Sequence, residues 1–424
     1  MAFPLLWIES TSVDPTLLVD RETFKDHLLS FLEENLDHPG TYSSVGVTGD
    51  RGVGKSIVTR WCLEEFERRN TGRVISLVID GRLAGLKRFF ADFIELIVKR
   101  GLAIVAGRED PEASLVRKWL HELSTLAQSD SVSETQVSEI ARTYGLGAAV
   151  KGGLFEVLEG TGSFSWQESR RAGGSVTRVT AVTTELMQKA ISQTLGQLAQ
   201  WTKLLVVVFF DDVDQLRGDP LATAVRHVLG IEGCVRVVHV RAESLDDDIR
   251  RETQHWFEVP AMTSAELVEM VERRMRAVRE RDRAWVQSDA VRAVVQRLAE
   301  QTGNPLVLLR WITYFAQSGA LDEDRIARWC EREMIDRAAQ VGFTPVPTSF
   351  LKRVAAAIDG LAPSAFGSHT KEQLDVALDE GAFEQAVRVG ALLPTGGDPL
   401  RGEWRLHAEL DLLRPQVIAK LAAS

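Results

Sequence analysis

The residue types best suited to chemistry gather in one glycine-rich turn near the start of the chain. The turn reads GDRGVGKS from Gly49 to Ser56, between a β-prone run and an apolar, helix-like run. Glycines let successive backbone N–H groups surround an anion without a Cβ in the way. Lys55 adds positive charge, and the Ser56 hydroxyl suits Mg²⁺, which prefers oxygen ligands. This order predicts a P-loop for nucleotide phosphates. The residues expected to line it are Gly49, Asp50, Arg51, Gly52, Val53, Gly54, Lys55, Ser56 and Ile57.

A pair of acids ends the most apolar run of the chain. The stretch Lys203–Asp214 reads KLLVVVFFDDVD, which is typical of a buried strand with carboxylates at its C-terminal end. In open α/β sheets this end of the strands is where ligands bind. We expect Asp211 to hold Mg²⁺, mostly through water, and Asp212 to orient the attacking water or accept its proton. The alternative is a strand followed by a solvated acidic turn.

A third candidate is the arginine that follows the next predicted strand. Cys234–Val240 reads CVRVVHV, and Arg241 comes directly after it. A polar group at that place is suited to contact the γ-phosphate of a nucleotide. An ordinary salt-bridged surface arginine is the competing interpretation, and the sequence leaves both open.

These side chains need a sheet to bring them together. Helix-like segments alternate with short apolar runs, a rhythm that predicts a parallel sheet with helices on both faces, the α/β class. The five predicted strands are centred on Val45–Val47, Arg73–Asp80, Lys203–Phe210, Cys234–Val240 and Trp256–Val259. The helices are predicted at about 56–69, 83–105, 111–127 and 176–201, after a first amphipathic helix within 12–38.

Residues 129–175 interrupt this rhythm with many Ser, Thr and Gly residues. We expect an insertion that pairs as a long hairpin, turning near Gly160–Gly162. Long loops of this kind are usually functional or disordered. A partner or self-association element and a mobile surface insertion are equally good interpretations.

The C-terminal half is predicted to be helical. Helical patterns cover a segment that begins after Ser264 and includes Arg283, and then about 288–301, 306–317 and 322–339. A last unit has three helices followed by two β-prone segments around a Gly/Pro-rich turn. That last layout is typical of a winged helix. The predicted organisation is an N-terminal helical segment (1–40), a P-loop ATPase domain (41–262), a helical lid (263–342) and a winged-helix-like domain (343–424).

Composition limits the class of protein. The net charge of −10 argues against broad, non-specific binding to nucleic acid. Cys62, Cys234 and Cys330 lie far apart without metal-ligand spacing, as expected in a reducing compartment. The first residues carry no basic segment typical of a signal peptide, and no apolar run reaches the length of a membrane span. We expect a cytoplasmic protein that does not enter the membrane.

With these motifs placed, the chain resembles the AAA+-related signal-transduction ATPases called STAND proteins, including NLR-like modules, and their origin-recognition-type relatives. GDRGVGKS matches Walker A and VVVFFDDVD matches Walker B. The phrase Val19–Glu22 (VDRE) resembles an upstream hhGRE motif, which implies that Arg21 reaches toward the nucleotide. Gly303-Asn304-Pro305 resembles a G-x-P motif, which implies that Pro305 packs against the adenine.

The chain departs from the family pattern in its arginines. No arginine follows the G-x-P-like turn directly, and Arg310 lies further along the predicted helix. The sequence does not assign an arginine finger, for which Arg217 and Arg226, after Walker B, are candidates. These departures favour slow hydrolysis over efficient turnover.

The resemblance implies a switch that binds ATP or ADP with Mg²⁺, hydrolyses ATP slowly, and changes conformation and assembly with its nucleotide. It also implies a nucleotide-dependent homo-oligomer or a separate effector protein, in bacterial defence or regulation. One alternative is a DNA-associated ATPase, a loader or transcription regulator that uses the winged helix; the acidic residues of that region disfavour it. Another is a scaffold that binds nucleotide without hydrolysing it.

Overall fold

We describe the fold from a computed structural model. The structure describes residues 21–37, 43–49, 52–81, 85–129, 131–133, 154–160, 167–170, 176–216, 221–241, 247–251, 253, 255–276, 295–296, 298–300, 304–309, 312, 328, 331–332, 346–361, 369–394, 403–407, 410 and 413–415.

A parallel sheet of five strands forms the centre of the N-terminal half, in the order β2-β6-β7-β1-β8. Every neighbouring pair in it is parallel. The strands are β1 (Ser44–Thr48), β2 (Val74–Asp80), β6 (Leu205–Asp211), β7 (Val235–His239) and β8 (His255–Glu258). The α/β fold expected of a P-loop ATPase is therefore confirmed.

Strand β6 is buried along its whole length because helices cover both faces of the sheet. Since side chains alternate along a strand, Val206, Val208 and Phe210 join one core cluster, and Leu205, Val207 and Phe209 join another. Each fully buried apolar side chain contributes about 1.5–3 kcal/mol. The run of apolar residues before Asp211 thus holds the acidic end of β6 at the edge of the core.

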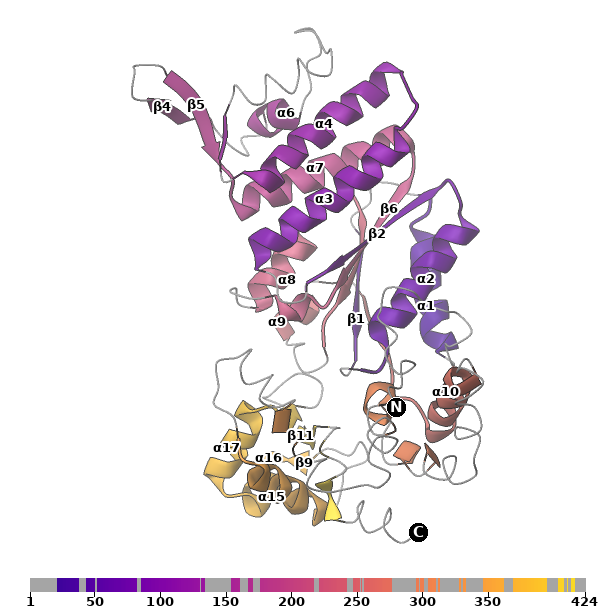
Figure 1. Ribbon diagram of the computed structural model, residues 1–424, viewed down its shortest axis with the longest axis vertical. Helices are drawn as coiled ribbons and strands as arrows, with labels where there is room; N and C mark the ends of the chain where they lie inside the picture. Colours follow the sequence, from indigo (N-terminus) through magenta and orange to yellow (C-terminus); the bar gives the residue numbers. More distant parts are fainter. Residues whose placement is uncertain are drawn as a thin grey trace.

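Two helical layers sandwich the sheet (Figure 1). One contains α1 (Glu22–Glu34) and α2 (Lys55–Arg69), whose buried residues share a cluster with Val207 and Phe209. The other contains α3 (Leu86–Ile104), α4 (Pro111–Gln128) and α7 (Thr184–Thr202). Shorter elements complete this half: η2 (Val213–Gln215), α8 (Leu221–Leu229) and α9 (Asp247–Arg251).

The insertion differs from the prediction. A helix, α6 (Leu154–Gly160), leads up to the point where the hairpin was expected to turn, in place of a strand. Leu154 and Leu158 are both fully buried, and a spacing of four residues puts them on one helical face. The antiparallel pair is instead β4 (Gln167–Arg170) with β5 (Val176–Ala181), next to β3 (Ser131–Ser133).

The prediction of a helix from residue 176 was therefore wrong at its start. The segment VTRVTA of β5 is rich in β-branched Val and Thr, which favours a strand. The helix begins later, after Thr183, whose side chain accepts a hydrogen bond from the Leu186 N–H at 3.2 Å. In Figure 1 the β4–β5 pair projects from the helical layer beside α6.

The C-terminal elements share one apolar cluster that runs from Met262 to Leu413. It joins α10 (Ser264–Arg276) to α15 (Thr348–Asp359), α16 (Lys371–Ala377) and α17 (Glu380–Arg388). A small antiparallel sheet accompanies them, with the order β10-β11-β9: β10 (Leu392–Pro394), β11 (Glu403–Leu406) and β9 (His369–Thr370). The two β-prone segments thus pair as expected, while the winged-helix and domain assignments stay predictions.

Most of the helices predicted between 288 and 339 lie outside the described residues. Within the described part of the chain, no helix combines the length and apolar character needed to cross a bilayer.

Candidate nucleotide-binding site

The glycine-rich turn joins the end of β1 to the start of α2. Gly54 precedes α2 with a φ of 96°, in the left-handed region that favours glycine. A Cβ added there would meet nothing within 4 Å, so open space lies beside the first turn of the helix. Gly54 has no side chain with which to cap that turn. The start of an α-helix, with its backbone N–H groups and positive dipole end, is a common binding site for anions.

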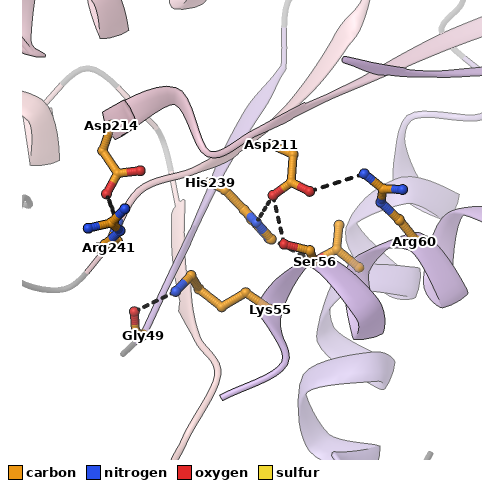
Figure 2. A network of polar contacts seen from close by, with 9 residues as sticks. Gly49, Lys55, Ser56, Arg60, Asp211, Asp214, His239 and Arg241 are labelled. Atoms are coloured by element: carbon orange, nitrogen blue, oxygen red, sulfur yellow. Dashed lines mark hydrogen bonds and ion pairs between the residues drawn. The ribbon is translucent and has the colours of Figure 1, made fainter. Parts of the chain in front are cut away.

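Lys55 is held at the same turn. The residue is buried, at 7% exposure, and its Nζ donates a hydrogen bond to the Gly49 carbonyl at 2.7 Å. The ammonium group therefore bridges the beginning and the end of the turn (Figure 2). A compact charge inside the loop is what phosphate oxygens require. Ile57, another predicted contact, is half-buried in the first turn of α2.

Asp211 lies at the centre of a network of donors (Figure 2). Its Oδ1 accepts a hydrogen bond from Ser56 Oγ at 2.8 Å and lies 2.9 Å from His239 Nδ1. Its Oδ2 accepts from Arg60 Nη2 at 3.3 Å. The structure thus brings together Ser56 and Asp211, the two residues predicted to hold Mg²⁺, and adds two residues that the sequence analysis did not predict.

The electrostatics favour an ionised Asp211. Burial alone would raise the pKa of this carboxyl, because it disfavours the charged form. The hydrogen bond and charge of His239, the Ser56 hydroxyl and the Arg60 guanidinium outweigh burial and lower the pKa to about 2. An ionised carboxylate beside a hydroxyl is a donor set that Mg²⁺ accepts. The open cradle at Gly54 and this pair therefore fit a nucleotide with its magnesium ion.

Asp212 has a left-handed backbone, with φ 49° and ψ 39°. Gly81, at the end of β2, packs against this turn: its N–H donates to the Asp211 carbonyl at 2.8 Å. A Cβ on Gly81 would lie 2.9 Å from the Asp212 carbonyl oxygen. The second acid is therefore fixed in an unusual backbone conformation, of the kind that clusters at functional sites.

Arg241 forms an ion pair with Asp214. Its Nε lies 3.2 Å from Asp214 Oδ2, and its backbone N–H donates to the same oxygen at 3.2 Å. The Arg241 side chain is 14% exposed and the Asp214 side chain 1%. The arginine is thus salt-bridged, as one interpretation held, but it is largely buried instead of lying on an open surface.

Two more segments contact carbonyls of the turn. Arg21 Nη2 donates to the Val53 carbonyl at 3.2 Å, and Arg21 Nη1 donates to the Pro260 carbonyl. The Leu306 N–H donates to the Gly52 carbonyl at 3.4 Å. Pro305 is buried at the start of the same short helical stretch, where the Asn304 side chain accepts from the Leu306 and Val307 N–H groups. Arg21 therefore contacts the P-loop directly. Pro305 directly precedes Leu306, which contacts the loop.

Some predicted residues cannot be placed. Several residues of the predicted motifs lie outside the described residues: Asp50 and Arg51 of the turn, Asp20, Gly303, Arg217 and Arg310. Arg226 is exposed on α8.

The polar contacts of the site include three residues that were not predicted: His239, Arg60 and Asp214. His239 is a polar residue inside an otherwise apolar strand, two positions before Arg241. Asp214 follows Asp211 by three positions. The polar residue in a buried strand was the one sequence feature that pointed to His239, because buried polar groups need partners.

A family model described as "AAA ATPase domain" matches residues 17–233, just over half of the 424-residue chain. A search of curated proteins found no match.

Several solved structures are similar over most of the chain. The ORC2 protein of Aeropyrum pernix, solved in ADPNP–ADP complexes, is 10% identical, with 99% of this chain and 98% of that chain covered and a TM-score of 0.42. The ORC1 protein of Aeropyrum pernix in complex with DNA is 15% identical, with 98% and 97% covered and a TM-score of 0.46. A Walker-type ATPase of Pyrococcus abyssi is 13% identical, with 96% and 99% covered and a TM-score of 0.46.

Proposed function

The chain belongs to the AAA ATPase domain family, and on that premise we propose that it is an ATP-driven molecular switch that hydrolyses its nucleotide slowly. ATP or ADP binds at the P-loop with Mg²⁺, and the nucleotide state sets the position of the segments that contact the loop. The STAND-type role and a place in bacterial regulation or defence are part of this proposal; they rest on the resemblance of the motifs.

Each polar residue of the site has a role in the proposed reaction. Lys55 and the N–H groups at the start of α2 bind the phosphates, and Ser56 and Asp211 hold the magnesium ion. Asp212 orients the attacking water, and Arg241 contacts the γ-phosphate. Arg21 reaches toward the nucleotide, and Pro305 packs against the adenine.

The main support for a nucleotide-dependent switch is the hydrogen bonding of two P-loop carbonyls. A peptide unit is planar and trans, so its C=O and N–H point in opposite directions. The Gly52 carbonyl is held by Leu306, and the Val53 carbonyl by Arg21. When the N–H groups of Val53 and Gly54 turn toward a phosphate, those two carbonyls must turn as well. Phosphate binding is thereby transmitted to the Leu306 segment and to the start of α1.

Slow turnover follows from the residues near the phosphate. The residue after Pro305 is Leu306, so the position directly after the G-x-P-like turn carries no arginine. An added arginine at the transferring phosphate is worth several orders of magnitude in rate in related P-loop chemistry. We therefore expect a switch that stays in its ATP state for long periods.

We further infer that the ATP state assembles, either with other copies of this chain or with a separate effector protein. The test is the molar mass in solution with ADP, with ATP and with a non-hydrolysable ATP analogue, measured beside Lys55→Ala. A mass increase only with the triphosphates, absent from the variant, supports assembly. An unchanged mass in all states contradicts self-assembly.

A further inference from the structure

His239 occupies a central place among the strands that form the site. It ends β7, which lies between β6 and β1 in the sheet. Its register partner on β1 is Val47, two residues before the glycine-rich turn. On the other side Val238 pairs with Phe210, the residue before Asp211. His239 is therefore next to both strands that deliver the nucleotide-binding residues.

The side chain of His239 points to the face of the sheet that α2 covers. Val235 and Val237 belong to the cluster on the α2 side, and His239 follows them at the same alternation. The His239 ring is 1% exposed, and the Phe209 ring packs against it edge-on with 4.5 Å between centroids. The imidazole is thus held in one orientation by packing.

Both ring nitrogens have partners in the site. Nδ1 lies 2.9 Å from Asp211 Oδ1, and Nε2 lies 3.1 Å from Thr59 Oγ1, on α2 one turn after Lys55. An ionised carboxylate can only accept hydrogen bonds, so Nδ1 donates to it. The Thr59 hydroxyl can donate a hydrogen bond to Nε2 or accept one from it, so the contact suits either form of the ring. His239 therefore connects the helix that begins at the phosphate site to the carboxylate at the end of β6.

We propose that His239 is a positioning residue that fixes the Asp211 carboxylate for the magnesium ion and couples it to α2. This inference rests on the proposed nucleotide site. With Ser56 and His239 both bonded to Oδ1, and Arg60 to Oδ2, the carboxylate has one favoured orientation. Residues that orient a metal ligand in this way typically change metal affinity 10–100-fold when they are replaced.

The test is a magnesium titration with a fluorescent ATP analogue. His239→Phe keeps the ring volume and removes both hydrogen bonds, whereas His239→Asn keeps an N–H donor at the position of Nδ1. We expect the Mg²⁺ concentration at half-maximal response to rise about tenfold or more in His239→Phe and to return to within about threefold of the parent value in His239→Asn. Binding of the analogue in EDTA reports the phosphate cradle alone, and we expect it to change little in either variant.

Thr59→Val provides a second test if His239→Phe does not fold. It removes the hydroxyl that Nε2 contacts and preserves the shape of the side chain. We expect a smaller rise in the same direction, about threefold. Unfolding temperatures measured on every variant separate lost folding from lost positioning.

The outcomes separate this inference from the proposed function. If the parent binds the analogue, Lys55→Ala does not, and the folded His239 and Thr59 variants all keep the magnesium response of the parent, this inference alone is wrong. Equal weakening in His239→Phe and His239→Asn also overturns it, because the retained donor should restore the response. If the parent itself does not bind the analogue, the inference falls together with the proposed function.

Discussion

The N–H of Leu306 donates to the carbonyl of Gly52, which joins a segment from the C-terminal half to the P-loop across 3.4 Å. Gly52 has a φ of +89° at this point. A Cβ on Gly52 would lie 2.6 Å from Leu306 Cβ and 2.7 Å from Asn304 Oδ1. The loop and the Leu306 segment are thus in direct contact, with no room for a side chain between them.

Gly52→Ala is therefore expected to destabilise the protein more than Gly54→Ala. Both residues have a left-handed φ, which costs an alanine about 1–2 kcal/mol. Only Gly52→Ala also forces a Cβ into Leu306, and overpacking of this kind adds about 1–3 kcal/mol. Denaturant unfolding of the nucleotide-free proteins measures the difference. Equal losses in the two variants would show that the contact with Leu306 does not constrain the loop.

Asp212→Asn is expected to keep nucleotide binding and to lose turnover. Asparagine tolerates the left-handed backbone of residue 212, so this substitution removes the charge without adding strain. Loss of a general base typically costs about 10²–10⁴ in rate. Phosphate release at saturating ATP measures it, with analogue binding as the control for an intact site. Turnover equal to that of the parent removes Asp212 from its assigned role.

Arg241→Gln is expected to reduce the preference for ATP over ADP. If Arg241 contacts the γ-phosphate, the variant loses one charge-assisted hydrogen bond of about 1.5–3 kcal/mol, which is about tenfold or more in the affinity ratio. Asp214→Asn should shift the ratio in the same direction, because Asp214 holds the arginine. Arg68→Gln serves as the matched control on an exposed arginine of α2. A ratio that changes as little in Arg241→Gln as in the control contradicts the assignment.

Acid stability provides a test of the Asp211 network. The pKa of Asp211 in the folded protein is about 2, below its ordinary value of 3.8. The folded state therefore gains stability from this group above about pH 4, and that stability is lost as the pH falls through about 2. The shift corresponds to about 2 kcal/mol.

Between those pH values the free energy of unfolding of the parent should fall by that amount relative to Asp211→Asn. Urea unfolding at a series of pH values gives both curves. Parallel curves would mean that the hydrogen bonds from His239 and Ser56 do not stabilise the ionised carboxylate.

The P-loop, the acidic end of β6 and the positions of the five strands along the chain could be predicted because each depends on a local sequence pattern. Gly49–Ser56 has fixed spacing, and the apolar run before Asp211 leaves few alternatives to a buried strand. The helix α6 was missed because it has seven residues, so the spacing of Leu154 and Leu158 is too short a pattern to give a recognisable helical period.

Two partners of Asp211, His239 and Arg60, were missed for a different reason. His239 approaches Asp211 because β6 and β7 are neighbours in a particular register, and a sequence does not state that register. Arg60 reaches the same carboxylate from α2, five residues after Lys55. Contacts of this kind depend on how separate elements pack, which local patterns do not encode.

In the proposed switch, the nucleotide changes the contact between the P-loop and the Leu306 segment. Hydrogen–deuterium exchange of peptides covering residues 304–309 measures this contact in the nucleotide-free, ADP-bound and ATP-analogue-bound protein. We predict that exchange differs between the ADP and ATP-analogue states of the parent, and that Lys55→Ala keeps its nucleotide-free exchange under all conditions. The same exchange in all states of a parent that demonstrably binds nucleotide would contradict the switch.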